Sequence, residues 1–335
     1  MRRSHHVAAI GLGLAGLLAA GGVAMTLAPS ASATSQVPEI APYFETSGTH
    51  TGNLQAAVTG HGLRSFTAAF VLGNGCTPTW DDGTPLATAT AENALVTAAK
   101  GKGATPIISF GGQAGIELAT GCTTQSKLVT AYTAVINRFK ITKIDFDIEG
   151  AAQINNSTVN ARRFTAIKTL EKKFPKLEVS LTLPVATTGL LSNPTYGNTI
   201  ALLKQAKKLG TRIDVINLMT MNYGGPISDM GSAATTAASK SLSQIKAIWP
   251  KDTYKNIGIT PMIGQNDVPG EVFTWADSQT VLAFAQGHGV KRLAFWALNR
   301  DQSCGAGDVA PGTCTAQTQQ PLDYTDGFLD TTPQT

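Results

Sequence analysis

The sequence predicts an α/β fold, a closed TIM (β/α)8 barrel that forms a single domain. Three observations carry this prediction. From about residue 39 onward, short segments rich in β-branched and apolar residues alternate with longer helix-like segments. Eight such units fit into about 300 residues, which suits one closed parallel barrel. Polar or aromatic residues follow nearly every predicted strand, and functional sites of such barrels lie at the carboxyl ends of the strands.

The individual elements follow from residue patterns. The predicted strands are residues 41–44, 65–72, 105–110, 143–149, 178–183, 215–223, 257–262 and 292–298. Apolar residues at spacings of three and four predict helices at 89–100, 126–139, 161–174, 199–209, 240–249 and 278–287, and a weaker pattern predicts one near 54–58. An open doubly wound sheet is the rival fold, but no Gly-rich phosphate loop follows the first strand. The short segment between the last two strands leaves no room for a large insertion.

The first 33 residues are interpreted as an export signal. Arg2 and Arg3 precede an apolar stretch at about residues 7–27, and Ala31-Ser32-Ala33 fits a cleavage site. The alternative is a membrane anchor, but Gly and Ala dilute the apolar stretch and no stop-transfer pattern follows. The paired arginines also permit a twin-arginine route, although the surrounding match is weak. We therefore expect secretion, with residues 34–335 forming the barrel domain.

Charge does not indicate a partner. The chain has 26 Lys and Arg against 22 Asp and Glu, and removal of Arg2 and Arg3 leaves 24 against 22. Basic residues in stretches such as 168–176 are mixed with Glu, as on a solvated helix face. We expect no nucleic acid partner, no membrane association after signal cleavage, and a monomer.

Four cysteines in an exported chain indicate two disulfides. Of the three possible pairings we favour Cys76 with Cys122 and Cys304 with Cys314. The first pair lies in loops that would be neighbours if the preceding strands pair in parallel, and the second closes a short Gly-rich loop. Metal binding is the alternative. It is disfavoured because there is no Cys-x-x-Cys, and the histidines of the mature chain are scattered without ligand spacing: His50, His61 and His288.

The fourth predicted strand carries three carboxylates at alternate positions, Asp145, Asp147 and Glu149. Because side chains alternate along a strand, these three are expected to project to one side while apolar residues between them pack on the other. Crowded carboxylates repel one another, so at least one should hold its proton to an unusually high pH, as a general acid does. The alternative is a half-buried strand with a solvated face, but no basic residue interrupts the run.

Three other strand ends could meet these carboxylates at the barrel mouth. The third strand ends in the segment 109–112, whose last two residues are glycines. Their missing side chains would let a ligand or a neighbouring strand approach closely, although the glycines also fit a plain turn. On the sixth strand, Tyr223 is in phase with Met219 and Met221 and is expected to face inward, although core packing is an alternative. On the eighth, Trp296 offers a flat platform for a sugar ring or a core aromatic side chain.

Together these motifs resemble glycoside hydrolase family 18, the chitinase family. The motifs are Ser109-Phe110-Gly111-Gly112, Asp145-x-Asp147-x-Glu149, Met221-Asn222-Tyr223 and Trp296. The likeness spans residues 39–330. Segments 263–267 and 295–301 are similar to the compact secreted bacterial members.

The resemblance implies a retaining chitinase whose nucleophile is the N-acetyl group of the substrate, acting on β-1,4-linked N-acetylglucosamine. Glu149 would protonate the glycosidic oxygen. Asp147 would hold the acetamido nitrogen and stabilise the oxazolinium ion, and Asp145 would share a proton with Asp147 or orient it. Tyr223 would position the acetyl oxygen, and Trp296 would lie beneath the sugar. The remaining substrate-binding residues implied by the resemblance are Met221, Asn222, Ser109, Gly111, Gly112 and Gln265.

The chain departs from the family pattern at three positions. Thr142 stands where the fully acidic motif begins with aspartate, Ile148 where tryptophan is frequent, and Asn222 where an aspartate is often seen. Thr142 and Asn222 could therefore change the ionisation of the catalytic aspartates, and with it the rate and the pH optimum. The short segment between strands seven and eight suggests an open groove and endo-action, by analogy with the family.

Two alternatives to an endo-acting chitinase stay open. One is an endo-β-N-acetylglucosaminidase that acts on glycoprotein glycans. The other is a non-catalytic barrel that binds chitin or inhibits, which the presence of Glu149 disfavours. Chitin or N-acetylglucosamine oligomers are the expected partners, with no cofactor and no metal.

Overall fold

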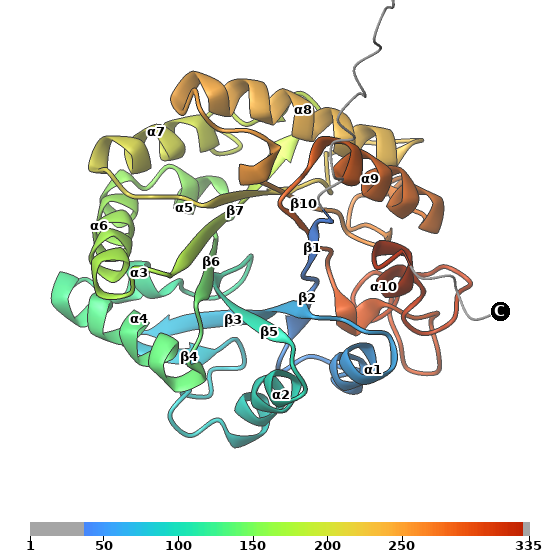
Figure 1. Ribbon diagram of the computed structural model, residues 1–335, viewed down its shortest axis with the longest axis horizontal. Coiled ribbons are helices and arrows are strands. Elements are labelled where there is room, and N and C mark those ends of the chain that lie inside the picture. Colours follow the sequence, from blue (N-terminus) through green and yellow to red (C-terminus); the bar gives the residue numbers. More distant parts are fainter. Residues whose placement is uncertain (1–36, 331–335) are drawn as a thin grey trace, which may run out of the picture. The chain divides into compact units, whose positions relative to one another are not determined.

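The computed structural model describes residues 37–330, whose parallel strands form a barrel surrounded by helices (Figure 1). Nine strands follow one another in the order β1, β13, β10, β9, β7, β6, β5, β3 and β2. β1 (Glu39–Ile40) and β2 (Tyr43–Glu45) belong to one extended segment, so the barrel has eight staves. β1 pairs with β13 (Arg292–Leu293) and β2 pairs with β3 (Ser65–Asn74), which closes the barrel.

The remaining staves also pair in parallel with their neighbours. They are β5 (Thr105–Gly111), β6 (Lys143–Asp147), β7 (Glu178–Ala186), β9 (Val215–Met219) and β10 (Ile257–Thr260). The predicted fold is therefore confirmed. Between β10 and β13 the chain adds only the hairpin of β11 (Gly264–Gln265) and β12 (Val272–Phe273) and one helix, so the expected lack of a large insertion is also confirmed.

Helices cover the outside of the barrel and bury apolar side chains against the strands. The long ones are α1 (Gly52–Gly60), α2 (Thr90–Gly101), α4 (Gln125–Phe139), α6 (Ser157–Lys173), α7 (Thr199–Leu209), α8 (Met230–Ile248) and α9 (Trp275–His288). Short helices are α3 (Leu118–Gly121), α5 (Ala151–Ile154) and α10 (Asp323–Phe328), with 3-10 turns η1 (Tyr254–Asn256) and η2 (Leu298–Arg300). Among the described helices, none is both long and apolar enough to span a membrane.

Helix α8 begins at Met230, ten residues before the predicted start at residue 240. Its first half contains Ala, Ser, Thr and Gly but few large apolar residues, so apolar periodicity missed it. The buried residues there include Ala234, Ala237 and Ala238, which shows that small side chains form its inward face. Asp229 caps the first turn by accepting a hydrogen bond from the Ser232 N–H.

Four predicted strands end earlier than expected. β6 ends at Asp147 rather than Glu149, β9 at Met219 rather than Tyr223, β10 at Thr260 rather than Met262, and β13 at Leu293 rather than Leu298. The cause at β6 is a turn, because Gly150 adopts a positive φ of 72°, which favours glycine. The expectation that all three carboxylates alternate along one strand is therefore wrong for Glu149, which lies just beyond it.

Both predicted disulfides are present. Cys76, in the turn between β3 and β4 (Thr77–Trp80), pairs with Cys122 at the end of α3, and Cys304 pairs with Cys314. The small antiparallel strand β8 (Gly189–Leu190) extends β7. The predicted signal peptide at residues 1–33 lies outside the described residues.

Four charged side chains close the N-terminal end of the barrel. Glu39, Lys143, Glu178 and Arg292 each occupy the first position of a strand. Lys143 Nζ lies 2.7 Å from Glu39 Oε1 and 3.4 Å from Glu178 Oε1. Arg292, which is 2% exposed, places Nη2 2.6 Å from Glu178 Oε1 and Nε 3.2 Å from Glu39 Oε2. Lys291 Nζ adds a contact of 3.3 Å to Glu178 Oε2, so each carboxylate of this basal network has at least two cationic partners.

Candidate active site

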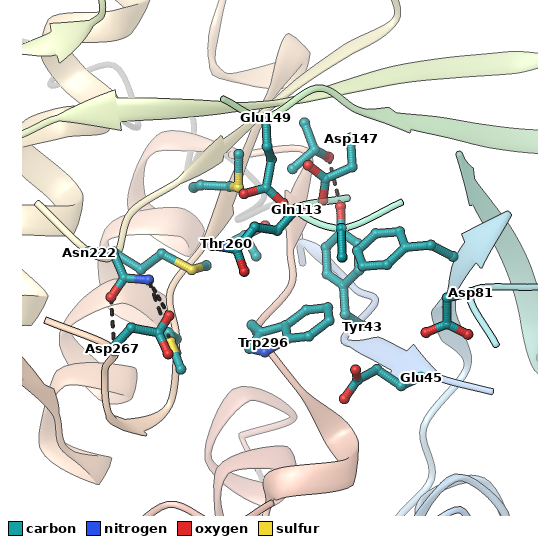
Figure 2. A pocket seen from close by; sticks show the side chains of 16 residues that line it. Tyr43, Glu45, Asp81, Gln113, Asp147, Glu149, Asn222, Thr260, Asp267 and Trp296 are labelled. Carbon is teal, nitrogen blue, oxygen red and sulfur yellow. Dashed lines mark hydrogen bonds between the residues drawn. The ribbon is translucent and has the colours of Figure 1, made fainter. Parts of the chain in front are cut away.

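A cavity of about 240 Å³ opens at the carboxyl ends of the strands, where the sequence predicts the site (Figure 2). Residues from most of the staves line its wall with acidic, amide, hydroxyl, aromatic, sulfur-containing and small side chains. They are Tyr43, Glu45, Phe70, Asp81, Gln113, Ala114, Asp147, Glu149, Thr182, Met219, Met221, Asn222, Thr260, Met262, Asp267 and Trp296. Mixed polar and aromatic walls of this kind suit a sugar chain, which presents hydroxyl groups at its edge and C–H groups on its faces.

Asp145 lies beneath the cavity and is surrounded by hydroxyl groups. Its Oδ2 is 2.8 Å from Ser109 Oγ and 3.0 Å from the Tyr43 hydroxyl. Its Oδ1 accepts hydrogen bonds from Ser180 Oγ at 2.6 Å and Thr182 Oγ1 at 2.9 Å. With four donors on two oxygens, and with 1% of the residue exposed, Asp145 is held in a single orientation.

The hydroxyl network continues to two further strands. Thr260 Oγ1 donates to Asn217 Oδ1 at 2.9 Å, and Asn217 Nδ2 donates to Thr182 Oγ1 at 3.1 Å. Thr182 in turn donates to Asp145. Because each donor has an acceptor along this chain, the network fixes the side chains of β6, β7, β9 and β10 relative to one another.

Asp147 stands above Asp145 and is 4% exposed. Its pKa is raised well above the usual range by burial, then by the charges of Glu149 and Asp145, and by a hydrogen bond with the Glu149 side chain. Two carboxyl groups joined by a hydrogen bond must share a proton. Its Oδ1 has no hydrogen-bond partner within the described part of the chain, although the residue lines the cavity. Asp147 therefore has one buried acceptor available to a ligand.

Glu149 projects into the same cavity from the turn after β6 (Figure 2). Burial raises the pKa of Glu149, the Asp147 hydrogen bond acts against this, and the charge of Asp267 raises it further. A carboxyl group with a raised pKa, half-buried in a cleft, meets the requirement for a general acid.

Trp296 lies with Phe70 and Tyr43 in a small aromatic cluster at the cavity wall. The Trp296 and Phe70 rings stack with centroids 5.6 Å apart and planes 10° apart, and Tyr43 lies 5.8 Å from Trp296. In Figure 2 the indole is below the carboxyl groups of Asp147 and Glu149, across the cavity from them. The predicted platform residue is therefore in a position to face a sugar ring.

Asn222 and Asp267 form one end of the cavity. Asn222 Nδ2 donates to Asp267 Oδ2 at 2.7 Å, and the Asp267 N–H donates to Asn222 Oδ1 at 3.0 Å. Met221 lines the cavity beside them, as expected from the sequence. Asp267 was not among the predicted site residues, although it ends the segment 263–267, whose sequence is similar to that of the compact bacterial enzymes.

Tyr223 does not line the cavity. Its ring packs against the main hydrophobic core, and its N–H donates to Glu271 Oε2 at 3.0 Å. The hydroxyl is buried and has no hydrogen-bond partner among the described residues, while burial and the charge of Glu271 raise its pKa. An unpaired buried hydroxyl can still accept a partner, so its catalytic role stays a prediction.

Four predicted substrate-binding residues lie outside the cavity wall. Ser109 is fully buried and contacts Asp145 rather than the cavity, so it positions that carboxylate. A Cβ on Gly111 would come within 2.1 Å of the Asp147 carbonyl oxygen, and one on Gly112 within 2.7 Å of the Phe70 ring. The missing side chains of the two glycines therefore allow the Asp147 backbone and the Phe70 ring to pack close to this segment. Gln265 is exposed on β11, and its carbonyl accepts a hydrogen bond from Arg300.

The sequence patterns missed the four cavity residues of the first strands, Tyr43, Glu45, Phe70 and Asp81. For Tyr43 and Glu45 the usable signal was their place at the end of the first strand, where barrel sites lie. Phe70 is on β3 but inside a continuous apolar run, and Asp81 follows a hairpin that the patterns did not predict. Among residues 37–330, no group of three or more His, Cys, Asp or Glu side chains has the arrangement of a metal site.

Known proteins are similar to this chain in sequence and in fold. Residues 39–261 match the family "Glycosyl hydrolases family 18". A probable bifunctional chitinase/lysozyme of Escherichia coli is 31% identical over 78% of the chain, and endochitinase 11 of Metarhizium anisopliae is 30% identical over 78%. The chain spans 30% and 52% of the lengths of these two relatives.

A solved structure is similar along most of its length. The active domain 2 of a thermostable chitinase from Pyrococcus furiosus, a catalytic-site mutant complexed with chito-oligosaccharides, is 29% identical. It aligns with a TM-score of 0.75 over 88% of this chain and 95% of its own. The family match covers more than half of the chain and coincides with the staves that carry the acidic site, and the chain therefore belongs to family 18 of the glycosyl hydrolases.

Proposed function

We propose that the protein is a chitinase that hydrolyses β-1,4 linkages between N-acetylglucosamine units. One observation carries the proposal: the Asp147 and Glu149 carboxyl groups, whose pKa values are both raised, lie across the cavity from Trp296. This places a proton donor and an unpaired acceptor on one side of a bound sugar and an aromatic surface on the other. The family, the two named relatives and the Pyrococcus furiosus complex support chitin as the substrate class.

In the proposed mechanism the acetamido oxygen of the substrate attacks C1 of its own sugar. The bond between C1 and the glycosidic oxygen breaks as Glu149 gives that oxygen a proton, and an oxazolinium ion forms. The unpaired Oδ1 of Asp147 accepts the acetamido N–H and stabilises the positive charge. The Glu149 carboxylate then takes a proton from water, and the water oxygen bonds to C1 as the bond between C1 and the acetamido oxygen breaks, which restores the N-acetyl group. Two inversions at C1 retain its configuration.

Asp145 acts through Asp147 in this scheme. Because both Asp145 oxygens already accept hydrogen bonds from hydroxyl groups, it has little capacity left for a substrate. Its charge is one of the causes of the raised pKa of Asp147. We assign it the role of a positioning residue that keeps the proton on the Asp147 and Glu149 pair.

We further propose that the enzyme is secreted and cleaves within chains. The sequence of residues 1–33 supports export. The short β11–β12 hairpin between β10 and β13 supports an open groove, because it adds only a few residues beside the cavity. A long substrate could then enter from the side rather than by its end.

The test is a time course of chitin hexamer cleavage, read by NMR that resolves the anomers. Wild-type enzyme is expected to release β-anomers first and to cut at internal bonds. Glu149→Gln removes the proton donor while preserving shape, and should lower kcat by about 10²- to 10⁴-fold with binding largely kept. Unchanged turnover in this variant, or α-anomers as first products, would refute the proposal. A high-mannose glycoprotein digested in parallel identifies an endo-β-N-acetylglucosaminidase.

A further inference from the structure

The end of the cavity opposite Asn222 and Asp267 carries two carboxylates, Glu45 and Asp81 (Figure 2). Glu45 is the last residue of β2, and Asp81 directly follows β4. Across residues 37–330, neither carboxylate lies within ion-pair distance of a lysine, arginine or histidine. The negative charges of Glu45 and Asp81 are therefore not compensated by cationic side chains of the described residues, as those of the basal network are.

The position of the pair is fixed by its neighbours. The Glu45 N–H donates to Asn299 Oδ1 at 2.8 Å, and Asn299 Nδ2 donates to the Glu45 carbonyl at 3.1 Å. Ser47 Oγ donates to Asp81 Oδ1. Burial and the charge of Asp81 raise the pKa of Glu45 to about 7, although Arg300 opposes this. The Arg300 guanidinium is itself committed to backbone carbonyl oxygens, among them that of Trp296.

The surroundings of the pair favour an organic cation over a metal ion. Two carboxylates are fewer than the six to eight oxygen ligands that calcium takes. The other walls here are the aromatic side chains of Tyr43, Phe70 and Trp296, which suit a sugar face and attract an ammonium group. The same cavity also holds the buried, unpaired Oδ1 of Asp147, which the proposed mechanism assigns to the acetamido N–H of the neighbouring sugar, so the cavity presents acceptors for N–H groups at both positions.

We propose that Glu45 and Asp81 form a subsite for the 2-ammonium group of a glucosamine unit in partly deacetylated chitin. The unit lies next to the sugar that faces Trp296. The inference rests on the proposed function and names a substrate class for it. An ammonium group offers three donors and a positive charge to the pair, whereas an acetamido group offers one donor and no charge. A sugar that carries a carboxylate would be repelled at the same place.

The test compares partly deacetylated chitosan with fully acetylated chitin hexamer, with products sequenced by mass spectrometry. Wild-type products should carry glucosamine enriched at one fixed position relative to the cleaved bond. In the double variant Glu45→Gln, Asp81→Asn this enrichment should disappear. The ratio of kcat/KM on chitosan to kcat/KM on the hexamer should fall about tenfold, since charged hydrogen bonds are being replaced by neutral ones.

The matched control is Asp82→Asn, which removes the neighbouring exposed carboxylate, whose hydrogen bonds within residues 37–330 come from Thr84. It should keep the wild-type ratio. If the double variant does not fold, Asp81→Asn alone carries the test because Asp81 is exposed. Glucosamine at random positions in wild-type products, or a ratio unchanged by the substitutions, would overturn the subsite. Failure of wild-type enzyme to cleave either substrate would instead overturn the proposed chitinase activity.

Discussion

The two ends of the barrel use the same residue types in opposite ways. In the basal network, burial acts to raise the pKa of Glu39, but Arg292 and Lys143 outweigh it and lower that pKa to about 2. At the mouth, burial raises the pKa of Asp147 and Glu149, and no cation lies within ion-pair distance of either among the described residues. Burial and neighbouring carboxylates thus raise the carboxyl pKa values at the mouth, whereas the cations of the basal network lower that of Glu39.

Asp145 connects the two ends. Arg292 Nη1 donates to Ser180 Oγ at 3.1 Å, and Ser180 Oγ donates to Asp145 Oδ1 at 2.6 Å. Arg292 is therefore linked to Asp145 through the Ser180 hydroxyl group. The positive charge of Arg292 is thus separated by Ser180 and Asp145 from Asp147 and Glu149, the two carboxyl groups that must hold a proton.

The largest expected effect is on catalysis, from Asp147→Asn. The substitution removes the shared proton and the carboxylate that would stabilise the oxazolinium ion, so kcat should fall about 10³-fold. Stability should not fall, because an uncompensated buried carboxyl group is replaced by a neutral one. Initial rates on chitin hexamer and denaturant unfolding check the two halves of this prediction.

The contrasting variant is Glu39→Gln, at the paired end of the barrel. It leaves the buried Arg292 with one partner fewer, and should lower stability while keeping kcat. A comparison in which Glu39→Gln lowers kcat as far as Asp147→Asn does would contradict the division between the two ends.

The next largest effect is on stability, from Arg292→Met. This change leaves Glu39 and Glu178 partly uncompensated in a buried site, which costs about 3–5 kcal/mol in the free energy of unfolding. The control is Arg212→Met, because Arg212 pairs with Asp214 at 2.9 Å but is 45% exposed. Exposed pairs contribute about 0–1 kcal/mol. Equal losses in the two variants, measured by urea unfolding, would show that burial does not set the value of these pairs.

The fold could be read from the sequence because each βα unit leaves a local pattern. The staves alternate with amphipathic helices, and only α8 began far from its predicted position since its inward face consists of alanine. The acidic motif was equally local, with Asp145 and Asp147 on β6 and Glu149 in the turn after it.

The rest of the site depends on closure of the barrel, which no local pattern encodes. The Tyr43 hydroxyl meets Asp145 and Thr182, which are 102 and 139 residues away in the sequence. Likewise, Ser109 lies within the expected strand but its hydroxyl bonds to Asp145 beneath the cavity, because Ser109 pairs with Asp145 across β5 and β6. The register of the closed sheet therefore decides whether a residue at a strand end faces the cavity or instead positions a carboxyl group such as that of Asp145.

The pH dependence of stability should separate the two ends. Glu39 has a folded pKa lowered from 4.5 to about 2, so its contribution is present above 4.5 and is lost as the pH falls toward 2, by about 3 kcal/mol. Asp147 and Glu149 have raised pKa values, so the folded state binds more protons and stability falls as the pH rises through their folded pKa values.

Stability should therefore be highest at mildly acidic pH, which thermal unfolding from pH 2 to 8 will measure. Glu39→Gln should flatten only the acid side of the curve, and Asp147→Asn only the alkaline side. Flattening of both sides by one variant would mean that the two ends titrate as one unit.

The smallest effect is expected from Ser109→Ala, which removes one of the four donors around Asp145. A single hydrogen bond to a charged group contributes about 1.5–3 kcal/mol at most, and three donors remain, so kcat should fall about tenfold. Because Ser109 acts through Asp145 rather than on substrate, KM should stay near its wild-type value while the pH profile of kcat shifts. Ser109→Thr, which restores the hydroxyl, should recover both. A rise in KM with kcat unchanged would instead support the substrate-binding role that the family resemblance implied for Ser109. In that case β5 would contribute a residue that contacts the sugar rather than one that positions Asp145.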